Sequence, residues 1–319
     1  MIVVRDNNVA TLDGRASVVA IGVFDGLHRG HQRIIGDARA IARQQNAALT
    51  VVTFDPHPAW VLAPARAPQL LATLDQRLEG LRTLGVEQVR IVTFDPTLAR
   101  ESGVTFIDRV LERELHAVAV MVGKDFRFGH DRVGDVALLE EEGARRGFEV
   151  VASSIHGEPN RWSSTAVRKA LREGDLALAN EILGRPFTIR AGVVHGDARG
   201  ADLGYRTANL DLALHQQIPH IGIYAGAVRT SPTTWWPAAI SVGTRPQFYE
   251  NGALLVEVHI PGFDGDLYGH RLDVSFLAHL RGEQSFDNVD ALVSQMGRDV
   301  AQTKEIFEKF SPTASALLE

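Results

Sequence analysis

The sequence contains no cysteine, and this absence excludes several kinds of chemistry at once. Disulfide bonds, cysteine-ligated zinc and a thiol nucleophile all require that residue. No apolar stretch approaches the roughly 18 residues of a transmembrane helix, and the first residues lack the basic start and apolar run of a secretory signal. We therefore expect a cytoplasmic protein without a membrane partner, whose chemistry comes from histidine, carboxylate, hydroxyl, basic and backbone groups or a bound metal.

Long runs of lysine or arginine are also missing, and the net charge is −6. Proteins that bind nucleic acid concentrate positive charge against the phosphates, so we expect no nucleic-acid partner. Small anions held in local basic pockets stay compatible with this composition. With 45% hydrophobic and 23% charged residues, the chain is typical of globular proteins. Its 319 residues predict two domains, because one hydrophobic core rarely serves more than about 250 to 300 residues.

The N-terminal half alternates short Val/Ile-rich runs with segments of helical periodicity. One such segment, residues 75–85, repeats leucine on one helical face before Gly85, which is a typical helix C-cap. This alternation indicates βαβ units around a parallel sheet. We therefore predict a doubly wound, Rossmann-like α/β domain over residues 1–185. Its expected strands are residues 17–24, 49–54, 89–94, 117–122 and 148–152.

The pattern changes after residues 163–186, which predict one or two short helices ending at Gly184. Beyond them, β-like runs are separated by Gly, Pro and Asp turns, which is typical of a small antiparallel β-barrel. From Asp287, apolar residues at helical spacing predict an amphipathic closing helix that packs on the barrel. We assign residues 186–319 to this second domain. The expected strands are residues 187–194, 222–229, 236–243, 254–260 and 271–280, and the helix face carries Leu292, Met296 and Val300.

The tetrapeptide TFDP occurs twice, at residues 53–56 and 93–96, each time directly after a predicted strand. Asp-Pro at a strand end can be simple turn punctuation, an alternative that stays open for the second copy. The first copy continues as His57 and Pro58 and has the character of a ligand loop. In an open α/β sheet the carboxyl ends of the strands border the ligand crevice, so both copies point to that edge.

The segment GVFDGLHRGHQRII, residues 22–35, carries the most specific motif. Gly26 permits a tight turn, a helix is expected to begin near His28, and His31 lies on the same face with Gly30 between them. Two imidazoles beside the exposed amides of a helix N-terminus form a donor cluster suited to triphosphate oxygens. The alternatives are histidines of the core or the surface, or a metal site without a nucleotide.

Two further segments carry polar groups between and after the strands. In WSSTAVRKAL, residues 162–171, Ser163 or Ser164 is a good N-cap and Arg168 lies about one turn into the helix. Capping and a solvated helix face are the alternative explanations there. The segment MVGKDFRFGHDRVGD, residues 121–135, is glycine-rich and follows a strand, so it can also be a plain turn.

These three segments, in this order, resemble the FMN adenylyltransferase half of bacterial bifunctional FAD synthetases, which carries the HxGH signature of nucleotidyltransferases. The resemblance covers residues 17–184. It implies that a phosphate oxygen of FMN attacks the α-phosphorus of ATP, with His28 and His31 on the phosphates and Arg168 on the leaving pyrophosphate. It further implies nucleotide binding by Gly22, Phe24, Asp25, Gly26, Gly30, Ser164 and Thr165, and flavin binding by Asp125, Arg127 and Phe128.

The stretch VVHGDARGADLGYRTANLDL, residues 193–212, with the segments downstream, resembles riboflavin kinase over residues 186–305. The resemblance implies that Thr207 and Asn209 bind the magnesium-nucleotide and the Mg²⁺ ion. Glu257 would be the base that takes a proton from the ribityl hydroxyl, with Glu283 as the alternative. Arg281 is expected at the flavin. Without the resemblance, Thr207 and Asn209 could serve a turn and Glu257 could be an exposed strand residue.

Three positions depart from the kinase pattern. Arg206 replaces the usual proline, Ala201 replaces a basic residue, and Gln247 replaces a threonine. The first hypothesis is a bifunctional enzyme that acts on riboflavin, FMN, FAD and ATP, with homo-oligomerisation left open. The alternatives are an adenylyltransferase with a weak or inactive kinase module and a flavin-sensing protein without turnover. A nucleotidyltransferase for another acceptor would leave the C-terminal module unexplained.

Overall fold

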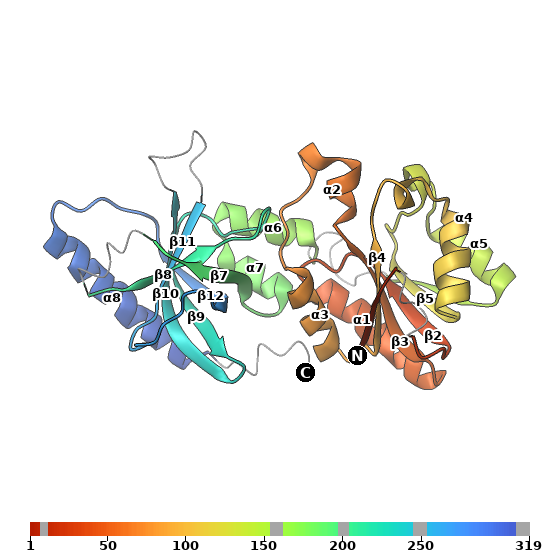
Figure 1. Ribbon diagram of the computed structural model, residues 1–319, viewed down its shortest axis with the longest axis horizontal. Coiled ribbons are helices and arrows are strands. Elements are labelled where there is room, and N and C mark those ends of the chain that lie inside the picture. The colour runs from red at the N-terminus through yellow and green to blue at the C-terminus, as the bar shows by residue number, and fades with distance from the viewer. Residues whose placement is uncertain (7–11, 154–161, 197–203, 245–253, 311–319) are drawn as a thin grey trace. The chain divides into compact units, whose positions relative to one another are not determined.

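A computed structural model describes residues 1–6, 12–153, 162–196, 204–244 and 254–310. The described residues form two compact units (Figure 1). The first comprises Met1–Pro68 and Leu74–Trp162, and the second comprises Gln69–Thr73 and the described residues from Ser163 onwards. The boundary predicted between residues 185 and 186 concerns the division of the two activities and stays a prediction.

A six-stranded sheet forms the centre of the first unit, and every pair of neighbouring strands is parallel. All five predicted strands are confirmed. The additional strand, β1, is a short edge strand that pairs with β4, and the sequence analysis missed it. The spatial order is β1-β4-β3-β2-β5-β6, with bounds Ile2–Arg5 (β1), Ser17–Ile21 (β2), Ala48–Asp55 (β3), Gln88–Thr93 (β4), Ala117–Gly123 (β5) and Glu149–Ser153 (β6).

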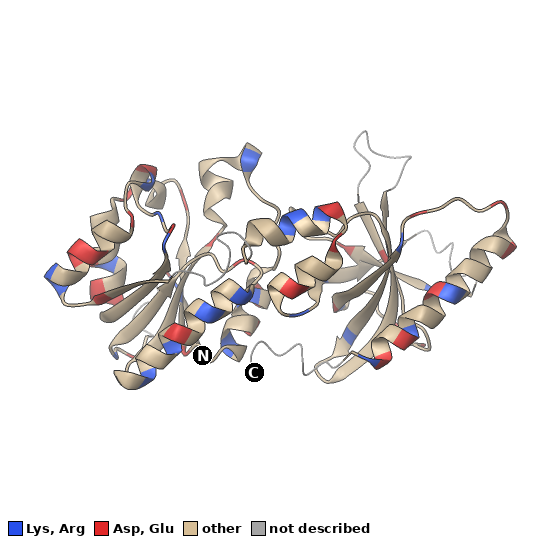
Figure 2. Ribbon diagram, turned by 180° about the vertical axis from the view of Figure 1, so that it is seen from behind, with Lys and Arg blue, Asp and Glu red and all other residues tan. Residues whose placement is uncertain are grey.

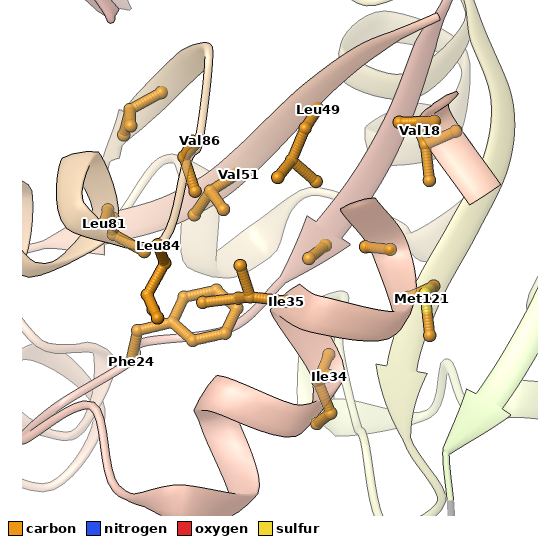
Figure 3. Packing of buried hydrophobic residues seen from close by; sticks show 14 of the residues in the cluster. Val18, Phe24, Ile34, Ile35, Leu49, Val51, Leu81, Leu84, Val86 and Met121 are labelled. Carbon is orange, nitrogen blue, oxygen red and sulfur yellow. The ribbon is translucent and has the colours of Figure 1, made fainter. Parts of the chain in front are cut away.

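Helices cover both faces of this sheet, as the continuous apolar strands require. Successive residues of β2 point to opposite sides, so Val18 packs with α1 and α3 on one face (Figure 3), whereas Val19 packs with α4 and α5 on the other. The helices are α1 (Arg29–Gln44), α2 (Pro58–Leu62), α3 (Leu74–Thr83), α4 (Gly103–Phe106), which continues as a π-helix (Ile107–Glu114), and α5 (Val136–Arg146).

A closed antiparallel barrel forms the centre of the second unit, in the order β10-β11-β8-β7-β12-β9. The predicted barrel is confirmed, with one strand more than expected. That strand, β8, contains Thr207 and Asn209, so the alternative that these residues serve a turn is wrong. The strands are Phe187–Val194 (β7), Thr207–Asp211 (β8), Gly222–Ser231 (β9), Thr234–Thr244 (β10), Leu254–His259 (β11) and Arg271–Arg281 (β12).

Three helices accompany the barrel: α6 (Ser164–Glu173), α7 (Leu176–Leu183), which ends at left-handed Gly184 as predicted, and α8 (Val289–Glu308). Asn180 fastens α7 to the barrel, because its amide donates to the carbonyl of Phe276 (3.0 Å) and accepts from the backbone N–H of Phe187 (2.7 Å). The predicted closing helix is confirmed, but Leu292, Met296 and Val300 are only half-buried, and Asp299 and Thr303 are its buried residues.

A buried ion-pair network crosses three barrel strands. Asp273 of β12 accepts from Arg190 of β7 (Nε to Oδ1, 2.5 Å) and from Arg229 of β9, and each arginine is its direct cross-strand neighbour. Burial alone would raise the pKa of Asp273, but the hydrogen bonds and charges of the two arginines outweigh it and hold the pKa below its ordinary value. The carboxylate therefore stays ionised and stabilises the seam of the barrel.

Replacing Asp273 with Asn should lower the free energy of unfolding of the barrel by roughly 3 kcal/mol near neutral pH, because Arg190 and Arg229 lose the negative charge of Asp273. The native pKa of Asp273 is depressed, so its stabilisation is fully present above about pH 4, the ordinary aspartate range, and is lost as the pH falls through the native pKa. Hydrogen exchange of β9 and β12 amides in the full chain measures this. Asp287→Asn, at an exposed position, is the control. If Asp273→Asn lowered the stability of the barrel equally at all pH values, the stabilisation would not come from the ionised carboxylate of Asp273.

Candidate active sites

The loop after β2 holds the predicted histidines in a strained, closely packed turn. Phe24 and Leu27 have left-handed φ values of 55° and 44°, beside Gly26 at 80°. Such conformations are costly for residues with a Cβ and persist where the surroundings impose them, often at functional sites. The Phe24 ring lies beside Ile35 and Leu84 in the core (Figure 3), so the turn is fixed from below by apolar packing.

His28 and His31 lie together at the start of α1. His28 is the N-cap, is 4% exposed, and accepts through Nδ1 from the backbone N–H of His31 (3.4 Å). The two rings stack with centroids 3.7 Å apart, and Phe24 packs edge-on against His31. Because Nδ1 of His28 is an acceptor, the ring proton belongs on Nε2, which makes that atom a donor. The expectation that the histidines share one face is met, and buried Gly30 keeps the gap between them small.

Arg77 of α3 ties the ends of β2 and β3 together, and sequence reasoning missed it. Its Nη1 donates to the carbonyl of Val23 (2.9 Å), to Oγ1 of Thr53 (3.2 Å) and to the carbonyl of Phe54 (3.3 Å). Only 4% of Arg77 is exposed, and burial lowers the pKa of its guanidinium while the charge of Asp25 opposes that shift. Arg77 therefore sets the positions of the HxGH loop and of the first TFDP segment relative to each other.

The glycine-rich loop after β5 leaves the sheet at the same edge. Since β2 and β5 are adjacent parallel strands, their following loops flank the point where the strand order reverses, which is where ligands bind in such sheets. Phe128 is buried and packs with Phe126 and Phe106, whereas Asp125 and Arg127 are exposed. The flavin-binding role of these three residues stays a prediction, and Phe128 also belongs to the hydrophobic core.

The third predicted motif opens α6 in the second unit. Ser163 is the N-cap and accepts from the backbone N–H of Ala166 (3.1 Å), which puts Ser164 and Thr165 in the first turn. Arg168 is buried, and its Nε donates to the carbonyl of Gln69 (2.5 Å). The alternative of a solvated helix face is therefore wrong for Arg168, while its role on the leaving pyrophosphate stays a prediction.

The polar residues of the kinase-like motif gather on one outer face of the barrel. Asn209 of β8 is the direct cross-strand partner of Glu257 on β11, and Oγ1 of Thr207 donates to Oε1 of Glu257 (3.4 Å). Glu257 is half-buried, so the alternative of an exposed strand residue is wrong. Asn209 is 5% exposed, and in the described part of the chain its Oδ1 is buried without a hydrogen-bond partner.

Gly196 leaves room for the Asn209 side chain. A Cβ built at Gly196 would lie 2.0 Å from Nδ2 and 2.6 Å from Oδ1 of Asn209, which is far inside contact distance. Both residues line a cavity of about 520 Å³. Its other polar lining includes Thr207, Arg206 and Asp264. A glycine at position 196 therefore leaves the space that the Asn209 amide occupies beside the cavity.

The departures from the kinase pattern fall in two places. Arg206 lies at the cavity rim, 83% exposed, and pairs with Asp264 (3.5 Å). Ala201 and Gln247 lie outside the described residues.

Arg281, expected at the flavin, makes ion-pair contacts to Asp299 of α8 (2.7 Å). The alternative base, Glu283, is exposed, and its carboxylate lies over Gly243 on β10.

Comparison with known proteins then decides the family. A family model for FAD synthetase matches residues 11–166, and one for riboflavin kinase matches residues 183–307. A bifunctional riboflavin kinase/FMN adenylyltransferase of Escherichia coli K12 is 36% identical over 96% of this chain and 97% of its own. The chain belongs to the bifunctional riboflavin kinase/FMN adenylyltransferase family. A relative of the same name from Pseudomonas fluorescens is 38% identical over 92% of this chain and 93% of its own.

A crystal structure from Streptococcus pneumoniae shares the fold of this family member almost end to end. It is 30% identical, covers 95% of this chain and 99% of its own, and has a TM-score of 0.83. That protein is named a macrolide-efflux protein. In the described part of the chain, no helix has both the length and the apolar character needed to cross a bilayer. The similarity to the Streptococcus pneumoniae structure supports the two-unit fold of this chain.

Replacing Arg77 with Lys should reduce FAD formation from FMN at least about tenfold, because one ammonium cannot take the places of both Nη1, which reaches three acceptors, and Nη2, which lies 3.8 Å from Asp55. We expect FMN formation from riboflavin to be unchanged. Steady-state kinetics of both reactions, with circular dichroism to confirm folding, measure the effect. Arg82→Lys, at an exposed position on the same helix, is the matched control; equal losses of both activities would show that Arg77 acts only through stability.

Replacing Gly196 with Ala should reduce FMN formation from riboflavin at least about tenfold, because the new methyl group must push the Asn209 amide out of place. FAD formation from FMN should stay within about twofold of wild type. Gly192→Ala, on β7 shortly before Gly196, is the matched control, since a Cβ there meets no atom within 4 Å. Wild-type kinase activity in Gly196→Ala would mean that the position of Asn209 does not matter.

Proposed function

We propose that this chain makes FMN from riboflavin in its barrel unit and FAD from FMN in its sheet unit, with one ATP used at each step. One observation carries the proposal: the chain holds both sets of site residues, and relatives with both activities in their name match it over nearly all of its length. Two positions support the proposal: the HxGH loop follows the carboxyl end of β2 in a parallel sheet, and Thr207 and Asn209 line a cavity beside the outer face of the barrel.

In the sheet unit, a phosphate oxygen of FMN attacks the α-phosphorus of ATP, and the bond from that phosphorus to the bridging oxygen of pyrophosphate breaks. No proton transfer or covalent enzyme intermediate is required. His28 and His31 act as donors beside the amides of the α1 N-terminus, where negative charge develops. Arg77 holds the loop in place, so the donors need little rearrangement.

In the barrel unit, Glu257 takes the proton of the ribityl 5′-hydroxyl as its oxygen attacks the γ-phosphorus of ATP, and ADP leaves. Thr207 contacts Glu257 and orients its carboxylate. Glu257 fits this role better than Glu283, because Glu257 lies beside Asn209 and Thr207 in a half-buried position, whereas Glu283 is exposed. The flavin chain would reach the carboxylate across the face formed by β8 and β11.

The residues of this face fit a magnesium-nucleotide. The buried Oδ1 of Asn209, unpartnered among the described residues, and the hydroxyl of Thr207 are oxygen ligands of the hard type that Mg²⁺ prefers. We propose that these two residues hold Mg²⁺ together with nucleotide phosphates. When bound, the ion supplies neutralisation of the charge that builds on the transferred phosphoryl group.

Of the three departures from the kinase pattern, only Arg206 lies in the described part of the chain, and its position there does not favour an inactive kinase module. The Arg206 guanidinium pairs with Asp264, and both side chains are exposed at the rim of the cavity. The deciding assay incubates the full chain with ATP, Mg²⁺ and either riboflavin or FMN, then separates the flavins by chromatography. FAD from both mixtures is the expected result, FAD from FMN alone would reveal a degenerate kinase module, and no FAD from either would overturn the proposal.

The two activities should separate by mutation. His31→Ala removes a phosphate donor, so FAD formation should fall about 100-fold or more while FMN formation persists. Glu257→Gln should abolish FMN formation and leave FAD formation from FMN intact, and Glu283→Gln, the matched control, should leave both. Chromatographic assays with each flavin measure these outcomes. If Glu283→Gln rather than Glu257→Gln stopped phosphorylation, the base would be misassigned.

A further inference from the structure

A second cavity, lined by three arginines, lies in the sheet unit, at the sheet edge opposite the HxGH loop. It has a volume of about 440 Å³, and its lining includes Arg15, Arg39, Arg43, Asn46 and Glu87. Arg15 comes just before β2, Asn46 just before β3 and Glu87 just before β4. Because these strands are parallel, the cavity borders their amino ends, whereas the HxGH loop follows the carboxyl end of β2.

The cavity lining includes one carboxylate, Glu87, and both of its oxygens accept hydrogen bonds from the protein. Glu87 accepts from Nη2 of Arg15 (2.8 Å) and, through its other oxygen, from the backbone N–H of Leu49 (3.1 Å). Arg15 is also paired with Asp13 (2.7 Å). Arg15 with Glu87 and Asp13 carries a net charge of −1, so the positive charge of the cavity comes from Arg39 and Arg43, which bring the five groups to +1.

Arg39 and Arg43 stand one turn apart on α1 and repel each other. Within the described ranges, neither has a carboxylate at ion-pairing distance, in contrast to Arg33 on the same helix, which pairs with Asp37 (3.0 Å). Arg39 is half-buried, and its stem lies across Gly85, whose left-handed φ of 80° admits glycine. Figure 2 shows basic and acidic residues mixed along most helices. Arg39 and Arg43 differ from the basic residues of a solvated helix face because both line the same cavity.

We propose that this cavity binds a phosphate-bearing anion through Arg39 and Arg43, separately from both active sites. Two guanidinium groups one helical turn apart suit the several oxygens of a phosphate or diphosphate, and the bound charge relieves their repulsion. Asn46, at the cavity wall, adds an amide donor. The shared chemistry is the phosphate group, whether from free phosphate, pyrophosphate or a nucleotide.

The site is well separated from the HxGH loop along the same helix. Along α1, Arg39 lies eight residues and Arg43 twelve residues beyond His31, which at about 1.5 Å per residue is roughly 12 Å and 18 Å of helix. An anion bound at the far end cannot contact His28 or His31. Binding there is therefore independent of the adenylyl-transfer chemistry proposed above, and it can be measured without turnover.

The test titrates the ¹⁵N-labelled full chain with inorganic pyrophosphate and follows the backbone amides of Asn46 and Gly85 by NMR. We expect saturable shifts in wild type, binding at least about tenfold weaker in Arg39→Gln/Arg43→Gln because two cations are lost, and wild-type binding in Arg33→Gln, the matched control. If the double variant does not fold, Arg43→Gln alone, at an exposed position, should weaken binding several-fold.

Separate arms with phosphate and ADP distinguish the source of the phosphate group. Tighter binding of ADP than pyrophosphate would indicate a nucleotide, and equal or weaker binding would indicate the free anion; both support the site. His31→Ala should leave the shifts at Asn46 and Gly85 unchanged. Shifts that do not saturate, that persist in the double variant, or that vanish in His31→Ala would overturn the proposal, the last because the signal would then come from the active site.

Discussion

The pairing of β2 with β3 on one side and β5 on the other is the constraint on which the sheet unit depends. The register sets Ala20 opposite Met121, so Gly22 and Gly123 leave the sheet at the same level. Segments far apart in the sequence thereby meet at the sheet edge where ligands bind in such folds. Arg77 adds the third element, since its buried fork bonds the chain just after β2 and the end of β3. The strained turn at Phe24 is supported from the core by this geometry.

In the barrel, the register between antiparallel strands brings the site residues together, as the order of parallel strands does in the sheet. Val256 and Val258 fill its interior, so Glu257 between them must face outwards, beside Asn209 on the next strand. A slip of one residue would bury the carboxylate and expose the valines, which is why the apolar interior also fixes the polar face. Gly196 then decides the last detail, the direction of the Asn209 amide.

Much of this architecture could be predicted from the sequence, because the sheet strands are continuous apolar runs and the helix ends carry clear caps. β8 could not, since three of its five residues, Ala208, Asn209 and Asp211, are of types depleted in strands, and its pairing with β7 and β11 overrides that preference. β1 was missed because it is short and lies at the edge. Arg77 was missed for another reason: a charged residue on an amphipathic helix normally faces water, and only the strand order reveals that it faces a crevice.

Arg206 shows why a charge that looks harmful in the sequence can be harmless in the fold. Arg206 is next to Thr207 along the chain, and a guanidinium close to a bound cation repels it. In space its side chain is exposed, and so is that of Asp264, its partner. Such a surface pair adds only about 0 to 1 kcal/mol of stability, yet it has nearly zero net charge, so its field falls off faster than that of a lone guanidinium. Even the lone charge would cost only about 1 kcal/mol at 4 Å in water. Arg206 lines the same cavity as Thr207 and Asn209, but the carboxylate of Asp264 beside it and the surrounding water both weaken its repulsion of a cation there.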